Sequence, residues 1–163
     1  MKKILFAVAA FIGVGLLFTN CTKTVHDSSD GSGSQALTEL FTIKASDWQG
    51  SNGNYTYGVN LSSFDQDIHD NGAYWAYISF DNGASYELLS TSNNIYTFYA
   101  TFDKDPNSSA YGVTIQAIGS STDPAPNMSI LIKVVSIPSS MVQQTANVDF
   151  KDYNQVKRVF NLK

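Results

Sequence analysis

Apolar residues in the segment 36–163 recur in short runs with a period of two, which is typical of strands with one buried face. The run 73–80 (AYWAYISF) places Tyr74, Ala76, Ile78 and Phe80 on one face. Segments 94–102 and 111–118 alternate in the same way. We therefore predict strands in all three segments, and further strands at 39–45, 54–61 and 85–89.

The segment 128–137 (MSILIKVVSI) has a different pattern, because it is apolar on both faces except at Lys133. A strand of this kind is expected in the centre of a sheet that is covered on both sides. Pro138 follows the run and should end the strand, since proline has no N–H to donate to a neighbouring strand.

The segments between the predicted strands favour antiparallel pairing. The sequence Asp81-Asn82-Gly83-Ala84 contains the Asn-Gly pair of a tight hairpin, and 103–109 and 119–127 are longer polar turns. Helical spacing occurs only at 152–161, with a single helical turn expected at 63–70. These features predict an all-β fold, an antiparallel β-sandwich of about seven to eight strands with a short C-terminal helix. A partly open barrel is the alternative.

The N-terminal segment has the layout of a secretory signal peptide. Lys2 and Lys3 precede an uncharged apolar run at 4–18, which is shorter than the roughly 20 residues of a membrane-spanning helix. The polar segment 22–35 is rich in Ser, Gly and Asp and should form a flexible tether. We expect a signal peptide at 1–20, a lipidated cysteine and tether at 21–35, and one β-sandwich domain at 36–163.

Cys21 is the only cysteine and lies directly behind the apolar run. The stretch Leu17-Phe18-Thr19-Asn20-Cys21 resembles the lipobox of bacterial lipoproteins, although Phe18 and Asn20 depart from its commonest residues. The resemblance implies that Cys21 carries a lipid and anchors the protein to a membrane of the cell envelope. We expect this to be the outer membrane, with the domain in the periplasm or on the cell surface.

Charge limits the possible partners. Removal of residues 1–20 takes away two lysines and no acidic residue, which leaves 8 basic and 14 acidic residues and a formal charge of −6. Because an acidic surface repels nucleic acid, we exclude a nucleic-acid partner. Membrane attachment is then assigned to the lipid on Cys21 alone.

A second resemblance covers most of the segment 36–163. It rests on Trp48, on 61–68 (LSSFDQDI) followed by 70–72 (DNG), and on 132–138 (IKVVSIP) and 148–157 (VDFKDYNQVK). The order is similar to that of an uncharacterised C-terminal β domain of bacterial surface lipoproteins, often found behind collagen-like repeats. This chain has no Gly-X-Y repeat, and the resemblance implies no activity.

No residue pattern indicates catalysis. The sole cysteine is assigned to the lipid, no Gly-x-Ser-x-Gly motif occurs, and the two histidines, His26 and His69, lie in the tether and in an Asp-rich turn. The domain contains only two glutamates, Glu39 and Glu87, so a glycosidase pair is not indicated. We expect no cofactor and regard an enzyme as a distant third possibility.

Two groups of residues are candidates for binding. Asp103, Asp105 and Asn107 match the first ligand positions of a calcium loop, but Ser108 and Thr114 occupy positions where Gly and Glu are expected. A second acidic cluster contains Asp65, Asp67 and Asp70, and solvated turns are the favoured explanation of both groups.

Exposed aromatic rings are the second kind of candidate, because they stack on sugars. If Trp48, Trp75 and Tyr77 are exposed together, they would form such a surface; otherwise they fill the core. The sequence thus predicts a non-catalytic envelope lipoprotein that binds a glycan or a surface protein. The alternative is a structural or accessory envelope protein without a ligand.

Overall fold

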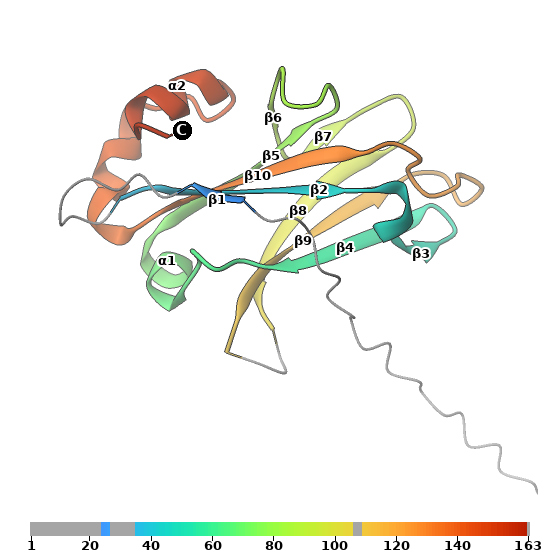
Figure 1. Ribbon diagram of the computed structural model, residues 1–163, viewed down its shortest axis with the longest axis horizontal. Coiled ribbons are helices and arrows are strands. Elements are labelled where there is room, and N and C mark those ends of the chain that lie inside the picture. The colour runs from blue at the N-terminus through green and yellow to red at the C-terminus, as the bar shows by residue number, and fades with distance from the viewer. Residues whose placement is uncertain (1–23, 27–34, 106–108, 163) are drawn as a thin grey trace, which may run out of the picture.

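The computed structural model describes residues 24–26, 35–105 and 109–162, which form two antiparallel sheets packed face to face (Figure 1). Sheet A has the order β1-β2-β10-β5-β6, with bounds Thr24–His26, Leu37–Ile43, Ile130–Ile137, Ala73–Ser79 and Glu87–Leu88. Sheet B has the order β3-β4-β9-β8-β7, with bounds Gln49–Ser51, Asn54–Asn60, Tyr111–Ile118, Thr97–Lys104 and Thr91–Ser92. The predicted antiparallel β-sandwich is confirmed.

Each predicted strand segment contains a strand, but some boundaries differ. The segment predicted to begin at residue 94 forms a strand only from Thr97. Before it, the Asn93 side chain accepts hydrogen bonds from the backbone N–H groups of Ile95 and Tyr96, at 2.9 and 2.7 Å. An Asn side chain that binds the backbone in this way holds a turn and delays the start of the strand.

The segment expected to be a tether contributes a strand to sheet A. β1 pairs antiparallel with β2, and Thr24 lies opposite Leu40 while His26 lies opposite Thr38. An edge strand offers unpaired N–H and C=O groups to any nearby backbone, and composition does not reveal this pairing. Residues 27–34, the remainder of the expected tether, lie outside the described residues.

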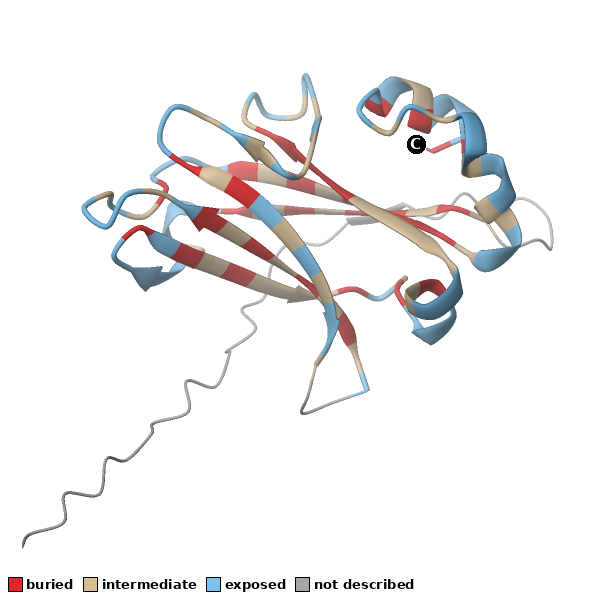
Figure 2. Ribbon diagram, turned by 180° about the vertical axis from the view of Figure 1, so that it is seen from behind, coloured by how far each residue is buried: buried red, intermediate tan, exposed pale blue. Residues whose placement is uncertain are grey.

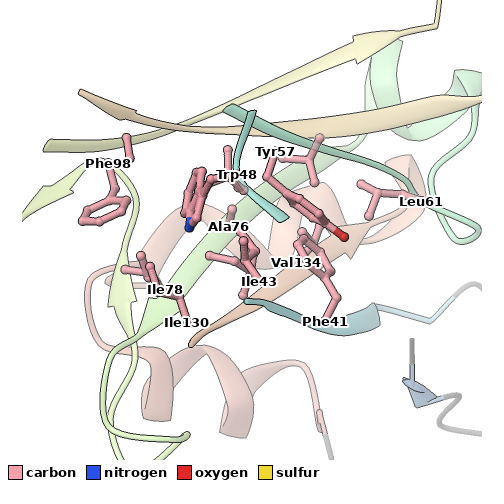
Figure 3. Close-up of a cluster of buried hydrophobic side chains, with 14 of the residues drawn as sticks. Phe41, Ile43, Trp48, Tyr57, Leu61, Ala76, Ile78, Phe98, Ile130 and Val134 are labelled. Carbon is pink, nitrogen blue, oxygen red and sulfur yellow. The ribbon is translucent and has the colours of Figure 1, made fainter. Parts of the chain in front are cut away.

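Most of the buried apolar side chains fill the space between the two sheets (Figure 3). β10 lies at the centre of sheet A, between β2 and β5, as the segment 128–137 predicted. Its Ile130, Ile132 and Val134 are fully buried between the sheets, and Val135 and Ile137 are fully buried on the opposite face. Ile115 of β9 is also fully buried, as expected of a core residue.

The C-terminal segment covers the outer face of sheet A. It consists of a 3-10 segment, η2 (Ser139–Asn147), which we had not predicted, and the expected short helix α2 (Tyr153–Val159). The α2 residues Tyr153 and Val156 pack against Tyr77 and Val135 of the sheet. None of the described elements packs on the outer face of sheet B, which is therefore bare (Figure 2).

The remaining short helices lie at the ends of the sandwich. α1 (Gln66–Asn71) connects β4 to β5, and the Asp65 side chain caps it by accepting a hydrogen bond from the Ile68 N–H at 2.9 Å. η1 (Ala45–Asp47) connects β2 to β3 at the other end. Within the described part of the chain, no helix has both the length and the apolar character to cross a bilayer.

The predicted Asn-Gly turn forms, and Asn82 and Gly83 have φ angles of 57° and 90°, but it lies within the longer connection 80–86 between β5 and β6 and does not close a tight hairpin. The Asp81 carboxylate holds the turn by accepting hydrogen bonds from the Ser85 N–H and hydroxyl and from the Ser79 hydroxyl, at 2.9, 2.5 and 2.7 Å. These bonds, those from Ser85 first, lower the pKa of Asp81 to about 2.

This pKa predicts how stability depends on pH. A lowered folded-state pKa stabilises the protein above about pH 4, and this stabilisation is lost as the pH falls toward 2. Between pH 5 and pH 2 we therefore expect the melting temperature of the wild type to fall further than that of Asp81→Asn, which has no carboxylate to protonate. Parallel melting curves would contradict this role of Asp81.

Candidate functional site

The three rings proposed as a stacking surface do not lie together. Trp48 is 8% exposed and points into the core between the sheets, where its ring centroid lies 6.4 Å from that of Phe98 (Figure 3). Tyr77 belongs to the apolar cluster on the other side of sheet A, where it is fully buried and its hydroxyl donates to the Phe150 carbonyl at 3.0 Å.

Trp75 is half-buried on the same outer face of sheet A as Tyr77, and the ring of Phe150 stacks on it at 3.7 Å with an angle of 11°. The hypothesis that Trp48, Trp75 and Tyr77 share an exposed surface is therefore wrong. Alternation placed Trp75 and Tyr77 correctly on one face. It does not reveal that the C-terminal segment covers this face.

The proposed calcium loop is a strand end in the structure. Asp103 is exposed within β8 and lies opposite Gly112 of β9, and the N–H of Asp105 donates to the Ala110 carbonyl at 2.9 Å. Asn107 lies outside the described residues. Among the residues that are described, no three His, Cys, Asp or Glu side chains gather in a way that would hold a metal ion. Extended backbone at residues 103–104 is unlike the coiled loop of an EF-hand site.

The second acidic cluster has a structural role. Asp65 caps α1, while Asp67 accepts hydrogen bonds from Ser139 and Asn71 at 2.8 and 3.1 Å. These bonds, that from Ser139 first, lower the pKa of Asp67. Asp70 is hydrogen-bonded to His69 Nδ1 at 2.7 Å, and this contact together with Gln66 lowers its pKa. A carboxyl group with a lowered pKa is ionised at neutral pH and is a poor general acid.

A pocket of about 380 Å³ opens beside α1, where Leu37, Ser62, Ser63 and Asp67 contribute to its wall. The fully buried Glu39 carboxylate accepts hydrogen bonds from the Ser63 N–H and hydroxyl, both at 2.6 Å. The sequence drew attention to Glu39 only as one of two glutamates. The two serines bind Glu39 of sheet A, and Asp67 binds Ser139 of η2, so these bonds fix α1 and its preceding loop to the rest of the domain and the pocket lining serves the fold.

A surface that the sequence analysis missed is the bare outer face of sheet B. Burial alternates along β8 and β9, so that Phe98 and Ile115 point inward while Tyr99, Thr101 and Gln116 point outward. The strand register sets these outward side chains in rows across the sheet: Thr56, Gln116 and Tyr99 form one row, and Gly58, Thr114 and Thr101 form the next.

The two rows contain hydroxyl, amide and aromatic groups and no charge. Tyr99 is 38% exposed, which is high for a tyrosine in the middle of a strand. The only charged residue on the outward positions of β4, β8 and β9 is Asp103, at the far end of β8. We refer to Thr56, Tyr99, Thr101, Thr114 and Gln116 as the neutral face.

Comparisons with protein-family models, with curated proteins and with solved structures found no match. The structure itself defines the class of the domain: an antiparallel β-sandwich with one face covered by a C-terminal helical segment and one face bare. Cys21, the predicted site of lipid attachment, lies outside the described residues.

Proposed function

We propose that the protein is a non-catalytic lipoprotein of the cell envelope, anchored in the outer membrane through Cys21, whose β-sandwich binds an uncharged glycan on the neutral face. The observation that carries the binding role is the bare, uncharged face of sheet B with an exposed tyrosine, Tyr99, on β8 at the end of one row.

The chemistry of the neutral face suits a sugar chain. A tyrosine ring offers an apolar surface to the C–H groups of a pyranose, and its hydroxyl offers a hydrogen bond at the edge. Thr101, Thr114 and Gln116 add hydroxyl and amide groups that both donate and accept hydrogen bonds. Because the surrounding protein is acidic but these rows are neutral, the face suits an uncharged polymer better than an anionic one.

One observation favours a non-catalytic role. Hydrogen bonds lower the pKa values of Asp67, Asp70 and Asp81, whereas a general acid needs a raised pKa. The second candidate function is a structural envelope protein without a ligand. Burial of Trp48 and Tyr77 favours it, since these rings fill the core.

The glycan hypothesis is tested with the soluble mature chain that carries Cys21→Ser. On an array of neutral and anionic glycans, we expect the wild-type domain to bind neutral chains. Tyr99→Ala should weaken binding about threefold to tenfold, the range expected for loss of one aromatic contact. Thr114→Asp should also weaken it, because it places a charge in the neutral face.

Asn154→Asp is the matched control, because it adds the same charge on exposed α2, on the other side of sheet A. If Thr114→Asp and Asn154→Asp weakened glycan binding equally, the neutral face would not be the binding site. Absence of binding to every glycan would favour the structural function, whereas capture of a surface protein blocked by Thr114→Asp would replace the glycan with a protein partner.

A further inference from the structure

Three of the large apolar side chains that are exposed lie at one end of the sandwich. They are Ile95, Ile118 and Met128, with exposed fractions of 58%, 40% and 42%. Ile118 ends β9, and Met128 lies just before β10, at the other end of the loop 119–129. Ile95 precedes β8, whose first residue, Thr97, lies opposite Ile118. We call these three residues the apolar rim.

The loop that carries Met128 is attached to the body of the sandwich. The Tyr55 hydroxyl donates to the Asp123 carbonyl at 2.8 Å, and the Tyr96 hydroxyl donates to the Pro124 carbonyl. Within the loop, the Asp123 carboxylate accepts a hydrogen bond from the Ser120 N–H at 2.6 Å. These bonds fix the base of the loop relative to sheet B, so the apolar rim is part of the folded domain.

The direction of β1 bears on where a lipid on Cys21 can reach. β1 is antiparallel to β2, so its first residue, Thr24, is nearer than its last, His26, to Ile43 at the end of β2. Ile43 lies opposite Ile130, two residues after Met128. Cys21 is separated from Thr24 by three peptide steps, which span at most about 10 Å. Thr24 lies opposite Leu40, three residues before Ile43, so while β1 stays paired this reach allows a lipid on Cys21 to extend to the end that carries the apolar rim.

The two segments that form the apolar rim carry little charge. The opposite end carries Asp65, Asp67 and Asp70 around α1, and an acidic end is repelled by an anionic membrane surface. The loop 89–96 has no charged residue, and the loop 119–129 has only Asp123. Lys44, Asp47, Asp81 and Glu87 also lie toward the rim end, outside the two segments that form the rim, and the Glu87 carboxylate accepts a hydrogen bond from the Thr91 hydroxyl of the segment 89–96 at 2.7 Å.

We propose that the apolar rim docks on the lipid bilayer, so that the domain stands end-on against the membrane instead of moving freely on a tether. Apolar side chains at the acyl boundary add to the affinity of a lipid anchor. In this orientation the neutral face stands beside the membrane and α1 points away from it. The inference rests on the lipid anchor of the proposed function, but not on its glycan.

Cys21 makes a direct test possible, because its sulfur carries the lipid and any introduced cysteine is then the only free thiol. The full lipidated protein is reconstituted in phosphatidylcholine vesicles that contain spin-labelled acyl chains. A polarity-sensitive dye is attached at Ile118→Cys or Met128→Cys, and for the control at Ser62→Cys or Asn71→Cys beside α1. We expect strong quenching and a blue shift at positions 118 and 128, and neither at positions 62 and 71.

A second variant tests whether the rim side chains cause the contact. Ile95→Asp combined with Ile118→Asp should reduce quenching of the dye at position 128 severalfold, while circular dichroism shows an unchanged fold. Unchanged quenching in this variant, or equal quenching at the two ends of the wild type, would overturn the docking. Vesicle flotation tests the lipid anchor separately from the docking of the apolar rim. Protein that fails to float would overturn the anchor together with the docking, whereas protein that floats without quenching at the rim would overturn only the docking.

Discussion

Truncation of Ile132 to alanine is expected to lower the free energy of unfolding by about 2–5 kcal/mol, the range for large-to-small substitutions in a packed core. Ile132 is fully buried in the middle of β10, between Phe41 of β2 and Ile78 of β5. Both neighbours are themselves fully or almost fully buried, so the surrounding side chains have little freedom to fill the cavity.

Val159→Ala is the matched control, because Val159 is 42% exposed at the end of α2. Its truncation should change the free energy of unfolding by less than about 0.5 kcal/mol, as is usual on a surface. Urea titration of the soluble Cys21→Ser chain, followed by circular dichroism, measures both variants. A loss below about 1 kcal/mol for Ile132→Ala would mean that the two sheets do not pack around this residue.

Strands that have one apolar face could be predicted from the sequence because burial follows their alternation. β9 illustrates this, since Val113 and Ile115 are buried while Thr114 and Gln116 are only partly buried. The apolar character of both faces of 128–137 likewise predicted a central strand. β1 and η2 were missed because pairing with an open edge, or a 3-10 turn after Pro138, depends on which surfaces the rest of the chain leaves available.

Lys133 shows what tertiary packing adds to a prediction from the sequence pattern. It is the single charged residue of the segment 128–137. In the structure its ammonium group lies 4.4 Å from the ring centroid of Tyr86 and 4.7 Å from that of Tyr153. Burial, with a smaller effect of Lys157, lowers the pKa of Lys133. The sequence showed that this position is an exception, but only the fold brings the two rings to it.

The sequence alone also could not identify the neutral face as a candidate binding surface. Alternation shows which residues share a face, but not which faces are covered by other elements. The face of 73–80 that carries Trp75 and Tyr77 was therefore predicted as a binding surface, although η2 and α2 cover it. Outward positions such as Thr101 and Thr114 were unremarkable in the sequence, and became a candidate surface only when the register placed them side by side on a bare sheet.

Replacement of Cys21 with serine is expected to move the protein from the membrane fraction to the soluble fraction. A serine hydroxyl cannot replace the thiol in lipid transfer. Without the lipid, only the three side chains of the apolar rim would favour the bilayer, and even one whole acyl chain gives only marginal, reversible membrane binding. The sandwich itself should be unaffected, because Cys21 precedes the first strand, Thr24–His26.

Two measurements separate loss of the lipid from loss of the fold. Labelling with a radioactive fatty acid should mark the wild type but not Cys21→Ser, and circular dichroism should show the same β-rich spectrum for both. Asn20→Gly is the matched control, because it changes the neighbouring residue toward the commoner lipobox pattern and should keep the label. Equal labelling of wild type and Cys21→Ser would disprove the lipid anchor. It would also remove the basis for docking of the rim, since β1 would then bring no acyl chain to that end of the sandwich.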